Sequence, residues 1–267
     1  MPFNCMHCTA RVATAFRGLF CAMLSGIISV MLSAVFTHNS FAQTTNKQSS
    51  FELMSPATQA IQLDDAQNPA MLWVKAGERA WASCTQCHGK AQESMRGVAA
   101  KFPRLVDQSL LDLRQQINRC RVKRLGLAAL GSSSEAMLQM TAFIGLQSKG
   151  LAITPSTDRL TEAAAKRGEI IFNQRMGQLD LSCAQCHDAR SGLRLGASVI
   201  VQGHPTGYPQ YRFEWQTLGS LARRMRGCMV GVRAAPFEAD ALEWLDLEAF
   251  LMRRAAGMIF ETPAVRP

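Results

Sequence analysis

The chain carries the pattern Cys-x-x-Cys-His twice, as Cys84-Thr85-Gln86-Cys87-His88 and as Cys183-Ala184-Gln185-Cys186-His187. In this pattern, two thiols add across the vinyl groups of a haem, and the adjacent imidazole becomes the proximal iron ligand. The spacing is short because both thioether bonds form on one edge of the porphyrin, while the imidazole must reach its centre. The two copies therefore predict two covalently bound haems c, with His88 and His187 on the iron atoms.

Two other chemistries use paired cysteines. Each Cys-x-x-Cys pair could close a disulfide loop, or both pairs could share one four-cysteine zinc site. Neither alternative needs a His directly after each pair. The repeated His therefore favours haem.

The first 42 residues have the features of an export signal. Arg11 and Arg17 give a positively charged start, and residues 18–36 are almost wholly apolar and carry no charge. Ser40-Phe41-Ala42 then offers small residues at the positions that a signal peptidase reads, so we expect cleavage after Ala42. The alternative is an uncleaved membrane anchor, because the apolar stretch approaches the length that spans a bilayer. Cleavage is favoured because the small-residue site follows directly.

The cysteine count leaves two thiols without an assignment. Of nine cysteines, three lie in the expected signal and four belong to the haem motifs. The signal cysteines are Cys5, Cys8 and Cys21. The remaining two, Cys120 and Cys228, would lie in an oxidising compartment, where the plain expectation is a disulfide between them.

The chain is basic, with a formal net charge of +9. Such a surface can indicate nucleic-acid binding. In an exported haem protein it indicates instead an anionic substrate, an acidic partner or neutralised haem propionates, so we expect no nucleic-acid partner. Beyond the signal, no stretch is long and apolar enough to span a bilayer, so we expect a soluble mature form with no membrane association.

The two halves of the chain repeat each other weakly at a nearly constant offset. Equivalent features recur in the same order: Lys75-Ala76-Gly77-Glu78 and Lys166-Arg167-Gly168-Glu169, Phe102-Pro103 and Tyr208-Pro209, Cys120 and Cys228, Ala142-Phe143 and Ala249-Phe250, Gly150 and Gly257. Two candidate helix-start boxes, Ser132 with Glu135 and Asp240 with Glu243, keep the same offset.

Each repeat is predicted to contain a helix, the haem motif, a loop, a helix with the single cysteine, and a terminal helix. The terminal helix is clearest after Asp240, where apolar residues recur at helical spacing. No series of strands is indicated. We therefore expect a mostly α protein.

Two tandem cytochrome c-like domains follow from this pattern, each with one covalently bound haem. The first covers residues 43–154, including an N-terminal extension (43–70) that wraps over a domain surface. The second covers residues 155–267. Between Ser148 and Asp158, Gly150, Pro155 and hydroxyl residues indicate a linker.

The spacing of residues alone does not identify the sixth ligand of each iron. Cys120 and Cys228 occupy equivalent positions, which suggests one thiolate per haem, but a disulfide between them fits the count equally well. Methionine is a common distal ligand, and fourteen methionines are present. His204 is a further candidate for the second haem, although a lone His in a loop is more often structural.

The surroundings of Cys228 favour chemistry at its sulfur. Arg223, Arg224, Arg226 and Arg233 lie within five residues of it, and Arg224 shares its helical face. Cationic neighbours favour the thiolate, and guanidinium groups form a forked site for a small oxyanion. The alternative is that these arginines neutralise haem propionates or form a solvated face.

Several segments carry a likeness to a known family: Phe51-Glu52-Leu53-Met54-Ser55-Pro56, Asn68-Pro69-Ala70-Met71-Leu72-Trp73, Gly203-His204-Pro205-Thr206-Gly207-Tyr208-Pro209, and Arg223 to Arg233. Over nearly the whole mature chain, the sequence resembles the SoxA family, the cytochrome subunits of the periplasmic sulfur-oxidising SoxAX complexes. The intact first motif makes it similar to the dihaem branch.

The resemblance implies that Cys120 and Cys228 are distal haem ligands. It further implies that Cys228 is the catalytic residue, carried as a persulfide, and that Arg224 binds substrate. The implied activity is L-cysteine S-thiosulfotransfer in the periplasm: thiosulfate is joined oxidatively to a cysteine of the carrier SoxYZ. The implied partners are a SoxX cytochrome subunit, in a heterodimer, and a downstream cytochrome c that takes two electrons.

Two other functions compete with this one. A thiosulfate dehydrogenase would couple two thiosulfates to tetrathionate without a carrier. A non-enzymatic dihaem electron carrier would have Met or His distal ligands and would tolerate loss of Cys228.

Overall fold

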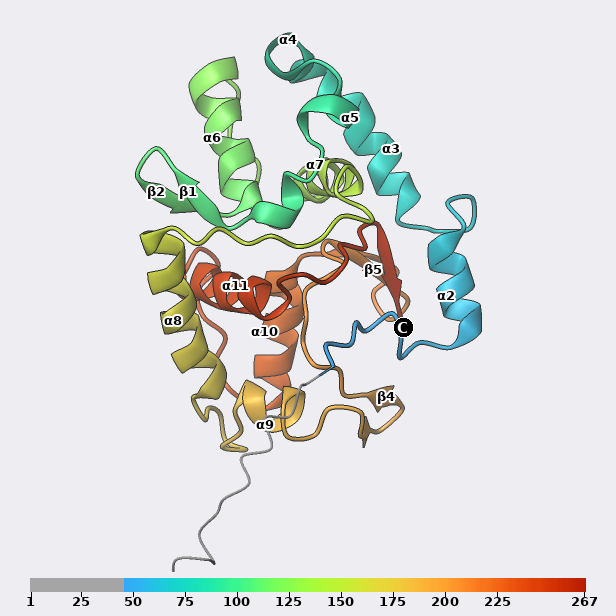
Figure 1. The fold of residues 1–267 in the computed structure, drawn as a ribbon, viewed down its shortest axis with the longest axis vertical. Coiled ribbons are helices and arrows are strands. Elements are labelled where there is room, and N and C mark those ends of the chain that lie inside the picture. The colour runs from blue at the N-terminus through green and yellow to red at the C-terminus, as the bar shows by residue number, and fades with distance from the viewer. Residues whose placement is uncertain (1–45) are drawn as a thin grey trace, which may run out of the picture. The chain divides into compact units, whose positions relative to one another are not determined.

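The computed structural model describes residues 46–267, and residues 47–267 form one compact unit (Figure 1). The expected signal peptide and its three cysteines lie outside the described residues. Within residues 46–267, none of the helices combines the length and the apolar character that a bilayer span requires.

The first repeat is mostly helical. In chain order its elements are α3 (Met71–Ala80), the 3-10 turn η1 (Trp81–Ser83), α4 (Thr85–His88), α5 (Ala91–Ser94), η2 (Ala99–Lys101), the strands β1 (Arg104–Val106) and β2 (Ser109–Leu111), α6 (Leu113–Leu125) and α7 (Glu135–Leu146). The haem motif lies at α4, and Cys120 lies on α6.

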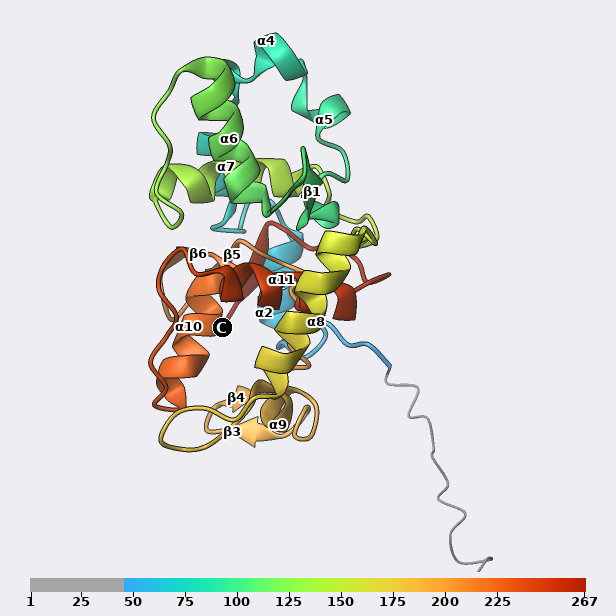
Figure 2. The same cartoon turned by 90° about the vertical axis from the view of Figure 1, so that its left-hand side faces the viewer.

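The second repeat follows the same plan with longer loops. Its elements are α8 (Arg159–Asn173), α9 (Cys183–His187), the strands β3 (Arg194–Leu195), β4 (Ser198–Val199), β5 (Gln210–Arg212) and β6 (Thr217–Gly219), then α10 (Leu221–Gly231), α11 (Leu242–Arg254) and the strand β7 (Ala264–Arg266). Figure 2 shows α3 to α7 above α8 to α11. The expected order of helix, haem motif, cysteine helix and terminal helix is therefore present twice.

Polar caps define the starts of the two cysteine helices. The Asp112 carboxylate accepts from the Gln115 backbone N–H at 2.8 Å, while the Gln115 side chain accepts from the Asp112 N–H at 2.9 Å. α6 ends at Gly126, which has a left-handed φ of 63°. In α10, the Ser220 hydroxyl accepts from the Arg223 N–H at 3.2 Å.

In both repeats the first helix crosses the last helix at a glycine. A Cβ on Gly77 of α3 would lie 2.1 Å from the carbonyl oxygen of Gln139 on α7. A Cβ on Gly168 of α8 would lie 2.0 Å from the carbonyl oxygen of Asp246 on α11. Only glycine lets the two backbones approach so closely. The repeated Lys-x-Gly-Glu pattern therefore marks a helix crossing.

The end of each repeat pairs with the end of the other. The Gly150 N–H donates to the Phe260 carbonyl at 2.9 Å, and the Gly257 N–H donates to the Ile153 carbonyl at 2.9 Å. The sequence offset that relates Gly150 to Gly257 also relates Ile153 to Phe260. Each glycine therefore donates to the counterpart of the residue that accepts from the other glycine. The expected linker is thus held in place by a reciprocal pairing, which is the signature of pseudo-two-fold symmetry.

The N-terminal extension packs on the C-terminal strand. β5 pairs with β6 antiparallel and with β7 parallel, in the order β6-β5-β7. α2 (Pro56–Leu63) contacts β7, where the Val265 N–H donates to the Gln62 side-chain oxygen at 2.9 Å. The Asn68 side-chain amide donates to the Pro263 carbonyl at 2.9 Å. The two ends of the described chain are therefore joined.

The short strands were not expected from the sequence. β1 pairs with β2, and β3 pairs with β4, as two-stranded hairpins of two or three residues per strand. Pairings of that length leave no alternating pattern long enough to recognise. The protein nevertheless remains mostly helical.

Both predicted helix-start boxes are wrong by one or two residues. α7 is capped by Ser134, whose hydroxyl accepts from the Met137 N–H at 3.3 Å, and not by Ser132. α11 begins after Ala241, and no side chain caps it; Asp240 is not its cap. There the Ala241 N–H already bonds to the Glu238 carbonyl at 3.1 Å, so a backbone turn replaces the side-chain cap.

Two hydrophobic clusters make up the core. The first surrounds Trp81 and Phe143 of the first repeat, and the second surrounds Phe172 and Phe250 of the second. The first cluster also takes in residues from the second half of the chain, namely Tyr211, Leu218, Met252, Ala255, Phe260 and Val265. The division into domains at residues 154 and 155 stays a prediction.

The crossing of α8 and α11 gives a test of the fold. Gly168→Ala forces the helices apart, so we expect it to lower the free energy of unfolding by about 1–3 kcal/mol. Gly231→Ala in α10 is the matched control, because its added Cβ meets nothing within 4 Å. Denaturant unfolding of both variants measures the difference. Equal stabilities for the two variants would contradict the close crossing.

Candidate functional site

The first haem motif opens onto a cavity of about 310 Å³. His88 and Cys84 of the motif line this cavity, and Cys120 of α6 lines it too. The structure therefore brings together the predicted proximal imidazole and the predicted distal thiol of the first site. Cys87, the other motif cysteine, is exposed.

Aromatic and aliphatic side chains form most of this cavity wall. Trp81 holds the motif in place, because its indole N–H donates to the Gly89 carbonyl at 3.0 Å and its ring lies 5.7 Å from the His88 ring. The rest of the wall is largely apolar, and it includes Val98, Phe102, Leu113, Ile117, Leu125 and Ile144. The thioethers of Met95 and Met140 line the cavity as well.

The second haem motif forms α9, which begins with a capping box. The Ser182 hydroxyl accepts from the Gln185 N–H, and the Gln185 side chain accepts from the Ser182 N–H. The His187 ring nitrogen Nδ1 lies 2.6 Å from the Val201 carbonyl oxygen. A histidine that donates Nδ1–H to a backbone carbonyl keeps Nε2 available for a metal. Gly203 lies against the ring, since an added Cβ would come within 3.3 Å of it.

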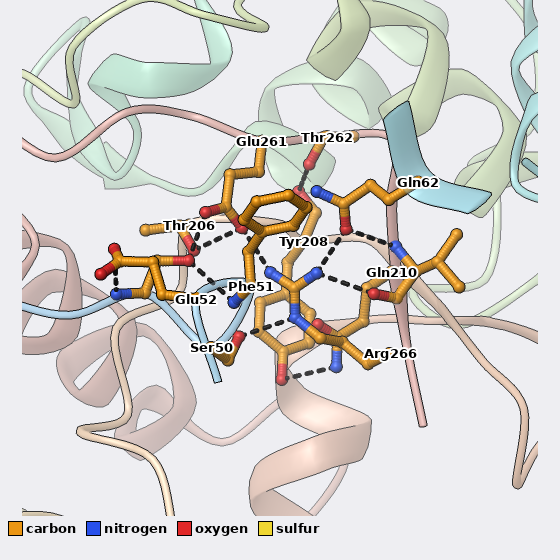
Figure 3. Close-up of polar contacts among 12 residues, drawn as sticks. Ser50, Phe51, Glu52, Gln62, Thr206, Tyr208, Gln210, Glu261, Thr262 and Arg266 are labelled. Carbon is orange, nitrogen blue, oxygen red and sulfur yellow. Dashed lines mark hydrogen bonds and ion pairs between the residues drawn. The ribbon is translucent and has the colours of Figure 1, made fainter. Parts of the chain in front are cut away.

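The loop that contacts His187 is anchored by a buried ion pair (Figure 3). Glu261 pairs with Arg266, whose side chains are 12% and 4% exposed. The Thr206 hydroxyl donates at 3.0 Å to Glu261 Oε2, the same carboxylate oxygen that pairs with Arg266. The Thr262 hydroxyl donates to the Tyr208 carbonyl at 2.9 Å. The network thus fixes the segment from Val201, whose carbonyl contacts His187, to Tyr208.

The same network includes the N-terminal extension. The Arg266 side chain donates to the Gln62 oxygen at 2.5 Å and to the Ser50 hydroxyl at 2.7 Å. The Ser49 hydroxyl donates to Glu261. The extension therefore supports the loop beside the second haem motif.

Cys228 interacts electrostatically with Cys183 of the second haem motif. Burial, with a nearby Cys228 thiolate adding to it, raises the pKa of the Cys183 thiol to about 11. Burial also lowers the pKa of His187, and the Arg224 guanidinium lowers it further. α10 therefore places the thiol of Cys228 and the cation of Arg224 beside α9.

Tyr208 belongs to the same group of side chains. Burial raises its pKa to about 12, while the charge of Arg224 opposes that shift and Cys228 adds to it. The Gln210 side-chain amide donates to the Tyr208 hydroxyl at 3.1 Å. The sequence marked Tyr208 only as a feature of the repeat, and its electrostatic interaction with Cys228 and Arg224 emerges from the fold.

The arginines around Cys228 separate into two groups. Arg223 is exposed and stacks on the Trp215 ring, with its guanidinium carbon 4.2 Å from the ring centroid. The Arg226 guanidinium donates to the Phe237 carbonyl at 3.0 Å. The half-buried Arg224 makes no hydrogen bond or ion pair with the described residues, so its guanidinium is available to an anion.

Arg233 lies apart from that group. It lines a second cavity, of about 460 Å³, together with Met176, Met229 and Phe237. It also has a positive φ of 57°, and its carbonyl accepts from the Gln178 N–H. The structure therefore places Arg233 beyond the end of α10.

His204 is engaged by its own loop. Its Nε2 lies 3.0 Å from the Gln202 side-chain oxygen. Burial lowers its pKa to about 4, and the charges of Arg254 and Lys47 contribute to the shift. This arrangement fits a neutral, structural histidine.

The alternative uses of the cysteines find no support in the geometry. All six cysteines of residues 46–267 are free thiols, so no disulfide joins Cys120 to Cys228. In this part of the chain, no three or more His, Cys, Asp or Glu side chains gather in a way that could hold a metal ion. The four motif cysteines therefore do not form one zinc site.

The residues fit covalently bound haem. The first motif has its imidazole and the free thiol of Cys120 in one cavity, which is largely apolar, as a porphyrin face requires. Among the described residues, a few buried polar atoms lack a partner, and three of them border these sites: Gln116 Oε1, His204 Nδ1 and Arg254 Nε. Groups that a bound cofactor would contact are expected to look this way.

The buried ion pair gives a second test. Arg266→Leu leaves Glu261 buried and unpaired, so we expect it to lower the free energy of unfolding by about 3–5 kcal/mol. Arg175→Leu is the matched control. It also breaks a pair between an arginine and a carboxylate, but the side chains of Arg175 and Asp180 are 57% and 68% exposed, so the expected cost is below about 1 kcal/mol. Thermal unfolding compares them, and a small effect at Arg266 would refute the anchoring role.

Comparison with known proteins identifies the family. The model of the SoxA/TsdA cytochrome c domain matches residues 68–153 and 167–260, and each segment contains one Cys-x-x-Cys-His motif. The L-cysteine S-thiosulfotransferase subunit SoxA of Rhodovulum sulfidophilum is 32% identical over 219 residues, 78% of this chain and 76% of the relative. That of Paracoccus pantotrophus is 32% identical over 228 residues, covering 82% and 78%.

A solved structure agrees with these relatives. The crystal structure of SoxXA from P. pantotrophus contains a chain that superposes with a TM-score of 0.79 at 30% identity. The match covers 83% of this chain and 87% of that one. The chain therefore belongs to the SoxA family of cytochromes c, which bind haem c covalently.

Proposed function

We propose that this protein is the SoxA subunit of a periplasmic SoxAX complex, an L-cysteine S-thiosulfotransferase that joins thiosulfate to a cysteine of the SoxYZ carrier. One observation carries the proposal. α10 presents a free thiol, Cys228, and an unpaired guanidinium, Arg224, on one helical face beside the second haem motif. This pair supports the proposal, because a thiosulfate site needs a nucleophile and an anion-binding group.

Two haems c complete the proposal, one in each tandem cytochrome c-like domain. Cys84 and Cys87 would hold the first and Cys183 and Cys186 the second. The axial pairs would be His88 with Cys120 and His187 with Cys228. When bound, the haems supply electron acceptance, and a thiolate ligand lowers their potential.

Substrate binding is the first role of these residues. Thiosulfate is a dianion, and Arg224 can hold two of its sulfonate oxygens through its forked N–H groups. Arg223 is stacked on Trp215 and Arg226 is bonded to Phe237, so within residues 46–267 Arg224 is the α10 arginine whose guanidinium stays open to an anion. Arg224 therefore orients the terminal sulfur toward Cys228.

Bond formation at Cys228 is oxidative. The Cys228 thiolate and the terminal sulfur of thiosulfate form one S–S bond, which gives a Cys228–S–S–SO₃⁻ adduct and releases two electrons. A haem held by Cys183, Cys186 and His187 would accept these electrons, and the SoxX cytochrome and a downstream cytochrome c would take them up in turn. Any proton that the Cys228 sulfur carries leaves to solvent as the S–S bond forms.

Transfer to the carrier then restores the enzyme. The carrier's cysteine thiolate attacks the sulfur that came from thiosulfate. Its S–S bond to Cys228 breaks, and Cys228 leaves as a thiolate. The carrier keeps the S–SO₃⁻ group, so atoms and charge balance across both steps.

Removal of the nucleophile tests the assignment. Cys228→Ala should abolish thiosulfate conjugation to the carrier, while intact-protein mass spectrometry should still find both haems attached. A soluble electron acceptor alone should give little turnover with the wild-type protein, unlike a thiosulfate dehydrogenase. Near-normal conjugation by Cys228→Ala would disprove the catalytic role.

Removal of the guanidinium tests substrate binding. Arg224→Ala should raise KM for thiosulfate roughly 10- to 100-fold, because a hydrogen bond to a charged group contributes about 1.5–3 kcal/mol. Arg226→Ala, on the same helix and with the same change of charge, is the control and should change KM little. Steady-state kinetics with the carrier as acceptor measures both variants. Similar effects from both would indicate a general charge effect instead of a binding site.

A further inference from the structure

The thiol of the first site has a specific polar neighbour. The side-chain amide nitrogen of Gln116 lies 3.3 Å from the sulfur of Cys120, one helical turn further along α6. Both residues line the cavity that contains His88. The amide oxygen of Gln116 is buried and has no partner among the described residues. The side chain is therefore held by its bond to sulfur rather than by the surrounding protein.

Gln116 occupies the position that corresponds to Arg224. Each residue lies four positions before the free cysteine of its repeat, on a helix that starts from a polar cap. The offset of 108 residues that relates Cys120 to Cys228 also relates Gln116 to Arg224, so the two positions are equivalent in the sequence repeat. One site thus has a neutral donor where the other has a cation.

Three arginines near Cys120 are already engaged, and Lys123 and Arg124 of the same helix are exposed. Arg119 pairs with Asp107 and donates to the Val106 carbonyl at 3.2 Å. Arg121 donates to the Ala128 carbonyl at 3.2 Å. Arg104 stacks on the Phe102 ring, with its guanidinium carbon 5.5 Å from the ring centroid. The group that faces the sulfur directly is therefore the neutral amide of Gln116.

We propose that Gln116 is a positioning residue of the first haem site, and that the residue four before the free cysteine decides which site binds an oxyanion. Gln116 donates its amide hydrogen to the Cys120 sulfur and offers no charge to a second anion. Arg224 leaves its guanidinium N–H groups free to bind an anion. The part that concerns Arg224 rests on the proposed function. The part that concerns Gln116 requires only that Cys120 ligates the first haem.

The hydrogen bond has a consequence for electron transfer. A donor to an axial thiolate withdraws electron density from the sulfur, which makes the sulfur a weaker donor to iron and raises the reduction potential. The first site is therefore an electron site whose potential is set by Gln116. The second site keeps its sulfur for chemistry.

Potentiometric titration of the holoprotein tests the first half of the proposal. Gln116→Leu removes the donor, so the potential of the first haem should shift to a more negative value, while that of the second haem stays unchanged. Gln116→Glu keeps the shape of the side chain but not the donor, and should shift it in the same direction. Gln139→Leu makes the same chemical change on α7, outside the cavity wall, and should have no effect. Unshifted potentials in both Gln116 variants would overturn the proposal.

Exchange of the two residues tests the second half. Thiosulfate added to the oxidised wild-type protein should perturb the visible or electron paramagnetic resonance signal of the second haem only. Arg224→Gln should remove that response, and Gln116→Arg should create one at the first haem. A wild-type response of equal strength at both haems, or none at the first haem of Gln116→Arg, would overturn the selecting role. The potential of the first haem is measured without thiosulfate, so failure of the proposed function would not hide this result.

Discussion

The close crossing of the first and last helix in each repeat is the constraint on which both sites depend. Gly77 and Gly168 carry no Cβ, so the backbones of α3 and α7, and of α8 and α11, come into direct contact. Each crossing directs the helix that precedes a Cys-x-x-Cys-His motif into the core. The motif therefore emerges where the cysteine helix passes, and an imidazole and a thiol reach one space. A side chain at either glycine would separate helices that jointly define a haem pocket.

The second site adds supports that the first lacks. A loop from Val201 to Tyr208 contacts His187 at one end and the surroundings of Cys228 at the other. Its backbone is tied to Glu261 and Arg266, which in turn hold the N-terminal extension. Sulfur chemistry requires a nucleophile, an anion-binding group and a metal ligand at fixed spacing. Buried charged side chains that each make several hydrogen bonds can hold such a loop more firmly than surface contacts can.

Internal symmetry makes the differences between the two sites informative. The repeats share the motif, the helix order and the position of the free cysteine, so a change at an equivalent position stands out. Gln116 and Arg224 are such a pair: Gln116 donates to the Cys120 sulfur, whereas Arg224 brings a charged donor one helical turn before Cys228. A duplicated electron-transfer domain can acquire a reaction centre in one copy through a small number of such changes, while the other copy keeps its original role.

The sequence alone determined the haem motifs, the repeat and the helix order, because these are features of spacing. Local charge and the family resemblance added Cys228 and Arg224 as predicted site residues. The sequence placed the caps of α7 and α11 wrongly, since a backbone turn and a neighbouring serine compete at those ends. Only the tertiary structure decided that Arg223 and Arg226 are occupied, that Gln116 touches Cys120, and that Tyr208 lies near Cys228. Those facts depend on contacts between residues far apart in the chain or on side-chain directions, and no local pattern records either of them.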